Sequence, residues 1–264
     1  MLLKRFFPAL LSLLICIACD SRSSSDQEST SLRQLNQTVK LDNAERIKAS
    51  IKMGAGRLRV MGGAKNLVDT DISFTRESWE PRIEYTNNGT TGRLRIEQEE
   101  LRGLNFNFGD EDENMWNIQL NNTVPYDLEV TMGAGESELD LRQLNLERLK
   151  IDAGVGEHEI NLSGSSVPDL QINAGVGEVS VDLSGERKNN LYADINGGIG
   201  ELNLLLPKGV GIRLEVNGAL GSINAPGLSK DNDVYFNALY GQSEVEIELN
   251  VKAGIGSVNV SIAD

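Results

Sequence analysis

The chain has 264 residues, and its 25 Lys and Arg against 39 Asp and Glu give a net charge of −14. This acidic balance excludes a nucleic-acid-binding function, which depends on clustered basic side chains that displace counterions from phosphates. It also disfavours electrostatic binding to anionic lipid, while the length suffices for one large domain or two smaller ones.

Residues 1–18 have the pattern of a signal peptide, with a short basic region followed by an apolar stretch that is short for a permanent transmembrane helix. The stretch ends in Ala-Cys at Cys19, which resembles the lipobox of bacterial lipoproteins, in which the cysteine becomes the acylated N-terminus. Cys16 departs from the aliphatic residue that is usual three positions earlier. We expect a lipid anchor at Cys19 that attaches the chain to a bilayer of the cell envelope, facing away from the cytoplasm. An ordinary cleaved signal peptide and an uncleaved anchor are the alternatives.

Residues 19–42 are predicted to be the lipid anchor and a flexible tether, because this polar, Ser-rich segment has too little apolar surface to offset the entropy of ordering. Apolar and polar residues alternate from about residue 42 onward, which predicts strands, and helix signals are poor. We expect an irregular β part over residues 43–130 and a regular repeat part over residues 131–264. The early strand candidates are 57–61, 71–74, 82–85, 93–97, 116–120 and 128–131.

A glycine motif recurs through the second half of the chain. The interval from Gly135 to Gly156 and on to Gly177 is 21 residues, followed by 23 to Gly200 and 21 to Gly221. Such a period indicates stacked supersecondary units. Strong copies occupy residues 132–141, 153–162, 174–183 and 197–206, weaker ones 218–225 and 253–260, and an early copy 53–60.

Each repeat has columns of defined chemistry. Positions two and four after the second glycine are mostly apolar and share one parity, so they face a core, and the glycines allow positive φ and close stacking at a corner. A polar column two residues before the motif predicts a side-chain ladder. Its members are Thr131, Asp152, Asn173, Asn196 and Asn217.

These features predict an all-β stacked repeat, in which each unit of about 21 residues forms one coil of a flattened β-solenoid. Rungs would be about 4.8 Å apart. An antiparallel sandwich is the alternative, but Asn-Gly or Asp-Gly hairpin signals are mostly lacking between the paired runs.

An acidic stripe is formed by Glu136, Glu157, Glu178 and Glu201, one residue after each glycine pair. Like charges about 5 Å apart repel, so the stripe could recruit Ca²⁺ or a basic partner. Its other interpretation is a solvated face that prevents aggregation. The acidic segment 109–114 imitates a calcium loop, but Met115 and Asn121 replace the turn glycine and the final glutamate, so we expect an exposed loop without metal.

His158 is the only histidine, and Ser137 lies one repeat earlier in the same core-facing column. A nucleophile pair is conceivable, but a satisfied polar pair in the core is the favoured interpretation. Zinc sites are excluded by the single histidine, and motifs for nucleotide binding or for hydrolysis are absent from the sequence. We therefore expect no enzyme activity, no cofactor and no resident metal.

Residues 53–162 contain GAG-x-L at 54–58, Trp116, VP-x-DL at 124–128 and GAG-x-x-x-LDL at 133–141. This combination resembles the toast-rack family of bacterial envelope proteins, which is related to candidate adhesins and to LiaF-type proteins of the cell-wall stress response. The resemblance implies a β-stacked envelope domain without established catalytic residues. The chain departs from LiaF-type proteins by lacking their N-terminal membrane helices.

The function expected from the sequence is that of a non-enzymatic envelope lipoprotein that acts as a protein-interaction or scaffolding module. We expect its partner to be an envelope protein, and we expect the chain to act in the envelope stress response. The alternative is an adhesin-like surface module that binds glycan or matrix.

Overall fold

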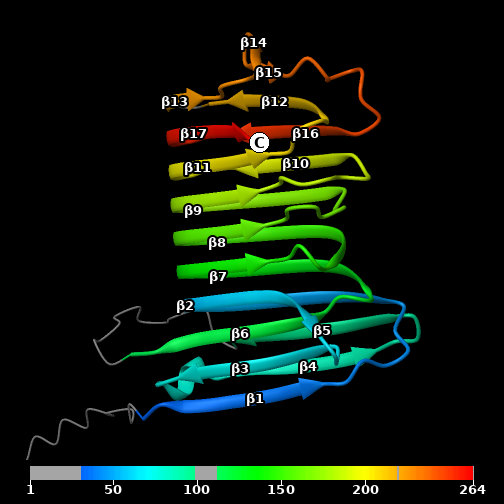
Figure 1. Ribbon diagram of the computed structural model, residues 1–264. Helices are drawn as coiled ribbons and strands as arrows, with labels where there is room; N and C mark the ends of the chain where they lie inside the picture. The colour runs from blue at the N-terminus through cyan, green and yellow to red at the C-terminus, as the bar shows by residue number, and fades with distance from the viewer. Residues whose placement is uncertain (1–30, 99–111, 219, 264) are drawn as a thin grey trace, which may run out of the picture.

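The computed structural model describes residues 31–98, 112–218 and 220–263, which form a long stack of β-strands (Figure 1). In these ranges the only helical element is a short 3-10 turn, η1 (Glu77–Trp79). The strands of the first part are β1 (Arg33–Val39), β2 (Arg46–Ala64), β3 (Val68–Phe74), β4 (Pro81–Asn87), β5 (Thr91–Gln98) and β6 (Asn114–Asn121). The others are β7 (Pro125–Asp140), β8 (Asn145–Asn161), β9 (Asp169–Asp182), β10 (Leu191–Asn196), β11 (Ile199–Leu206), β12 (Gly211–Asn217), β13 (Leu220–Asn224), β14 (Ser229–Asp231), β15 (Val234–Phe236), β16 (Glu246–Lys252) and β17 (Ile255–Ile262).

Each rung of the stack has two limbs that meet at a glycine corner. The first limb precedes the glycines in the sequence, and the second limb follows them. In β2, β7, β8 and β9 one long strand supplies both limbs, whereas the pairs β10–β11, β12–β13 and β16–β17 supply one limb each. Neighbouring rungs are parallel and in register, so Gly135, Gly156 and Gly177 lie directly opposite one another. The stacked β-solenoid predicted from the repeat is confirmed.

The corner requires glycine for two physical reasons. Gly156 has φ +142°, and a Cβ built on it would lie 1.8 Å from the carbonyl oxygen of Gly135 in the rung below. L-residues with a side chain rarely adopt this backbone conformation, and no Cβ fits so close to a main-chain oxygen.

The order of the rungs departs from the order of the sequence at both ends. The stack runs β2, β7, β8, β9 and β10–β11, as the parallel pairings show. The last strands of the chain, β16–β17, come next, and β12–β13 stack on their other side. Gly256 therefore lies between Gly200 and Gly221, although 21 residues separate those two in the sequence.

Antiparallel strands complete each end of the stack. At the end of the stack that contains β2, the strands β5 and β6 pair in parallel with the two limbs of β2. β4 then pairs antiparallel with β5, and β3 pairs antiparallel with β6. β1 adds to β3, so residues 33–39 of the expected flexible tether form an ordered strand, which corrects that prediction. At the other end β15 covers β12, and β14 covers β15.

The core lies between the two limbs along the whole stack. Columns such as Leu128, Leu149 and Leu170 of the first limb, and Leu139, Ile160 and Val181 of the second, are almost fully buried. Trp116 of β6 is also fully buried. In the part of the chain that the structure describes, no helix has the length and apolar character needed to cross a membrane.

Candidate functional site

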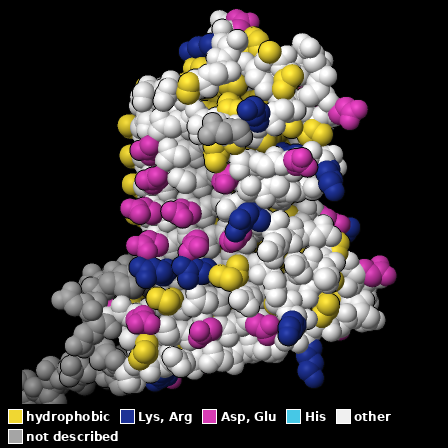
Figure 2. All heavy atoms as spheres, in the orientation of Figure 1, with side chains coloured by type: hydrophobic (Ala, Val, Ile, Leu, Met, Phe, Trp, Pro, Cys, Tyr) yellow, Lys and Arg dark blue, Asp and Glu magenta, His cyan; other side chains and the backbone are white. Residues whose placement is uncertain are grey.

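The acidic stripe predicted from the repeat lies on the outer face of the second limbs. Glu136, Glu157, Glu178 and Glu201 are direct register partners on β7, β8, β9 and β11. Glu138 and Glu159 form a second acidic column two residues further along. Acidic side chains accordingly gather on this side of the molecule (Figure 2).

The repulsion within the stripe is relieved at its two ends. Basic side chains of β2 lie at one end and amide side chains at the other, which replaces like-charge contacts by favourable ones. The contacts are Arg57 Nε to Glu136 Oε2 (2.9 Å), Arg59 Nη2 to Glu138 Oε2 (2.6 Å), Asn203 Nδ2 to Glu178 Oε1 (2.8 Å) and Asn259 Nδ2 to Glu201 Oε1 (2.6 Å). Within the described ranges Glu157 and Glu159, at the centre, receive neither a hydrogen bond nor an ion pair.

The stripe is poorly shaped for a metal ion. Among the residues that the structure describes, no three His, Cys, Asp or Glu side chains lie close enough together to hold one. Carboxylates on successive parallel strands project side by side, whereas Ca²⁺ needs six to eight oxygen atoms that converge on one point. The arrangement suits a row of cationic side chains better than a single ion.

The acidic segment before β6 is only partly described, since residues 109–111 lie outside the described ranges. Asp112 differs from the exposed position expected of it, because its side chain is 4% exposed and is paired with Arg76. Arg76 in turn lies 4.7 Å from the ring centroid of Trp79. This carboxylate therefore stabilises the base of the stack.

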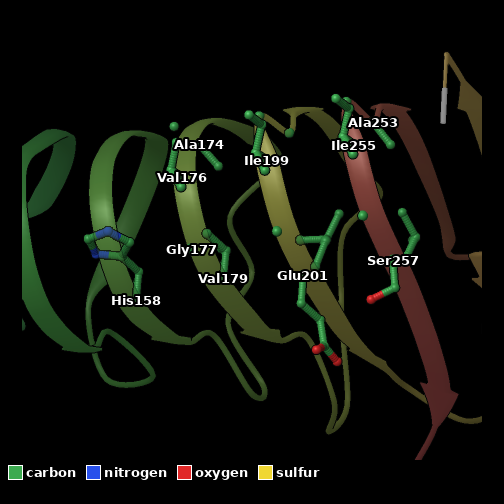
Figure 3. Close-up of a pocket in the computed structure, with 18 of the residues that line it drawn as sticks. His158, Ala174, Val176, Gly177, Val179, Ile199, Glu201, Ala253, Ile255 and Ser257 are labelled. Atoms are coloured by element: carbon green, nitrogen blue, oxygen red, sulfur yellow. The ribbon is translucent and has the colours of Figure 1, made fainter. Parts of the chain in front are cut away.

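An exposed aliphatic ridge runs beside the stripe at the glycine corner. Its members are the residues just before the second glycine of each successive corner, and they are register partners on neighbouring rungs, namely Val155, Val176, Ile199, Ile255 and Leu220. They are 47–71% exposed, and Val176, Ile199 and Ile255 point the same way, off the outside of the corner (Figure 3). The equivalent residues of the first two rungs are Ala55 and Ala134, so the ridge begins at β8.

This ridge was not predicted from the sequence. Alternation of apolar and polar residues does not predict which way the residue before the second glycine points. The positive φ of that glycine turns the chain, so the alternation of one limb does not continue into the other. The available signal was the change of that residue from alanine in the early copies to valine, isoleucine or leucine in the later ones.

A groove of about 580 Å³ follows the outer face of the second limbs next to the stripe. Carboxylate, amide and hydroxyl side chains form much of its wall, including those of Glu159, Asn161, Ser180, Asp182 and Asn203. The ridge, the stripe and the groove are thus adjacent features of one side of the stack.

Ser137 and His158 meet in the core, as their shared column predicted. Ser137 Oγ lies 2.8 Å from His158 Nδ1, and both residues are buried. Burial lowers the pKa of His158, which therefore stays neutral near pH 7. His158 Nε2 is buried without a hydrogen-bond partner in the described residues, so the pair is satisfied on one side only.

The same pair lacks the arrangement of a nucleophile and its base. In such a dyad a third group orients the histidine through its second nitrogen, and the hydroxyl faces a site that substrate can enter. Here the second nitrogen is unpartnered, and the adjacent cavity in the glycine corner is only about 40 Å³ (Figure 3). The space fits roughly a water molecule.

The predicted side-chain ladder is present over three rungs. Asn173 Nδ2 donates to Asp152 Oδ1 at 2.6 Å, and Asn196 Nδ2 donates to Asn173 Oδ1 at 2.8 Å. On the next rung Lys252, not Asn217, is the register partner of Asn196, because β16 is inserted there. Cys19, the predicted lipid attachment site, lies outside the described residues.

Comparison with known proteins gives both a family and a fold. The family model described as the N-terminal domain of toast-rack matches residues 27–169 and 165–205. The crystal structure of a candidate cell adhesion protein from Clostridium sporogenes is 29% identical, covers 88% of this chain and 100% of its own, and superposes with a TM-score of 0.69. A candidate adhesin from Bacteroides fragilis is 13% identical, with 89% and 99% coverage and a TM-score of 0.32. No curated protein matches the chain.

Proposed function

Because the chain belongs to the toast-rack family, we propose that it is a non-enzymatic, envelope-anchored protein that binds another protein through the corner and outer face of its second limbs. The observation that carries the proposal is the aliphatic ridge, five exposed side chains aligned on consecutive rungs. Monomeric soluble proteins rarely expose contiguous apolar side chains without a binding role. The ridge contributes little to the core, since all five side chains are exposed and those of Val176, Ile199 and Ile255 point away from the core (Figure 3).

The chemistry beside the ridge indicates what kind of protein would bind. An apolar centre flanked by polar groups is the ordinary composition of a protein interface. The unpaired carboxylates of Glu157 and Glu159 would accept Lys or Arg side chains, and the net charge of −14 would speed the approach of a basic surface. The partner is therefore an envelope protein that presents aliphatic side chains with basic residues beside them.

The anchor is the second part of the proposal. A lipid on Cys19 would hold the chain at a membrane, and the ordered domain begins at the end of the stack that contains β1. The ridge starts several rungs further along, at β8, so the membrane would not cover it. A role in an envelope stress-response assembly fits this arrangement.

An adhesin-like module that binds glycan or matrix is the second candidate. It is supported by the name of the Clostridium sporogenes protein and by the polar groove, whose amides and hydroxyls suit the hydroxyl groups of sugars. The ridge favours a protein partner, because sugars would leave its aliphatic side chains exposed.

Crosslinking in native membranes tests the proposal. A photoreactive residue replaces Val176 on the ridge in the full-length chain, and the matched control carries it at Tyr192, which is 58% exposed on the first limb. We expect one dominant protein adduct from position 176 and none from position 192. Equal labelling from both positions, or recovery of glycan alone from position 176, would contradict a protein-binding ridge.

The anchor is tested separately with Cys19→Ala. The variant should lose metabolic palmitate labelling and leave the membrane fraction. Retention in the membrane with unchanged labelling would show that Cys19 is not the attachment site.

A further inference from the structure

The second limb of the last rung, β13, has an open edge. β13 pairs with β17 on one side, and no strand in the described parts of the chain pairs with its other side. Four of its five residues are exposed, so no loop within the described ranges covers it either. By contrast β12, the first limb of the same rung, is covered by β15.

β13 also lacks the charges that protect the other outer strands. Edge strands commonly carry charged side chains, which hinder pairing with another chain. β1, β4 and β14 follow this rule with Arg33, Arg82, Glu84, Lys230 and Asp231. The sequence of β13, Leu-Gly-Ser-Ile-Asn, contains no charged residue.

The acidic stripe ends before it reaches this edge. On the last two rungs Ser257 and Ser222 occupy the positions that glutamate holds on the four rungs before them. Asn224 and Asn259 lie side by side in the neighbouring column. Hydroxyl and amide groups both donate and accept hydrogen bonds, so this surface is complementary to itself, whereas carboxylates would repel a second copy.

The direction of the main-chain groups defines a register. The amide of Leu220 donates to the carbonyl oxygen of Gly254 at 2.9 Å, so Leu220, Ser222 and Asn224 direct their main-chain groups toward β17. Gly221 and Ile223 direct theirs toward the open edge. Antiparallel pairing about a two-fold axis at Ser222 would place Gly221 opposite Ile223 of the other copy, with four N–H···O bonds between them.

We propose that β13 pairs antiparallel with β13 of a second copy of this chain, about a two-fold axis at Ser222. The contact joins two stacks end to end, with the β1 ends at opposite extremes (Figure 1). It uses neither the acidic stripe nor most of the ridge, and therefore stands independently of the proposed partner. Chains attached by their N-terminal ends would meet in this way from two facing surfaces.

Disulfide formation by Ser222→Cys in the full-length chain tests the register. Two residues on the axis form a non-hydrogen-bonded pair with Cα atoms about 4.5 Å apart, which a disulfide can bridge. Mild oxidation should give a covalent dimer. Asn224→Cys is the matched control, since it would lie opposite Leu220 and should not link to itself, and the unmodified chain reports any background from Cys16 or Cys19.

A charge at the same position tests the contact without crosslinking. The full-length chain in detergent is examined by sedimentation at concentrations up to about 1 mM, where even weak contacts form. We expect a dimer that Ser222→Lys converts to a monomer without a change in melting temperature. A monomer throughout, a dimer that tolerates Ser222→Lys, or equal linkage at 222 and 224 would overturn the proposal.

Discussion

The central rungs and the last rungs of the stack are built from the same motif, but they assemble differently. β7, β8 and β9 follow one another both in the sequence and in space. Near the far end, β16–β17 separates β10–β11 from β12–β13, although the glycine spacing there is again 21 residues. The repeat therefore specifies the shape of a rung, and the choice of neighbour depends on which strand edge remains free.

Removal of residues 245–264 should have the largest effect, because it deletes the rung on which β12–β13 stacks. Leu249 and Val251 are fully buried between their neighbours, so the loss exposes core on both sides. Hydrogen exchange should show lost protection over residues 211–224 and retained protection in β7–β9. Retained protection at 211–217 would mean that β12–β13 can stack directly on β10–β11. The last rungs would then assemble in sequence order, as the central rungs do.

Gly156→Ala should be the most damaging point change in the central rungs. Its Cβ would lie 1.8 Å from the carbonyl oxygen of Gly135, so two in-register rungs must separate. We expect a loss of about 4 kcal/mol or more in the free energy of unfolding, measured with urea. Gly209→Ala is the control, because its φ of +89° imposes strain in open space, at a cost of about 1 kcal/mol. Equal losses would show that backbone strain, not stacking, requires glycine at the corner.

His158→Val should remove a pH dependence from the centre of the stack. Because burial lowers the pKa of His158, the unfolded chain binds the proton more readily, and stability falls as the pH drops below about 6.5. The loss is at most about 1.4 kcal/mol per pH unit for this one group. Val179 occupies the same column in the next rung, so valine should fit. The free energy of unfolding, measured with urea, should fall between pH 7 and pH 5 in the parent chain and fall less in the variant. An equal fall in both chains would show that His158 is not the source of the pH dependence.

Arg57→Gln should have the smallest effect. Its ion pair with Glu136 is more than half exposed, and such pairs contribute about 0–1 kcal/mol. Thermal melting at low and high salt should show a small destabilisation that disappears as salt increases. A large or salt-independent loss would indicate that Arg57 supports the first rung by packing.

Much of the fold follows from local pattern. The early strand candidates at 57–61, 71–74, 82–85, 93–97, 116–120 and 128–131 all lie in strands, because each alternates apolar and polar residues. The contact of Ser137 with His158 also followed from the 21-residue step. Both predictions needed only neighbours that the repeat itself supplies.

What could not be predicted depends on distant parts of the chain. In β1 only Leu35 and Val39 are apolar, and the strand exists because β3, more than thirty residues later, offers a free edge. The insertion of β16–β17 leaves no mark on the glycine spacing, so Asn217 was expected in the ladder where Lys252 lies. The ridge was not predicted because the alternation of inward and outward side chains is interrupted at the corner, where Val176 and its equivalents lie.

The place of β16–β17 in the stack has a consequence for biosynthesis. A ribosome completes residues 211–224 before residues 246–262 are synthesised. The nascent chain therefore contains the last rung, β12–β13, before it contains β16–β17, the rung on which β12–β13 stacks. At about 5–20 residues per second the delay lasts seconds, during which β11 and β12 present unpaired edges. Export in an unfolded state would remove this interval, because the whole chain would then be available before any strand pairs.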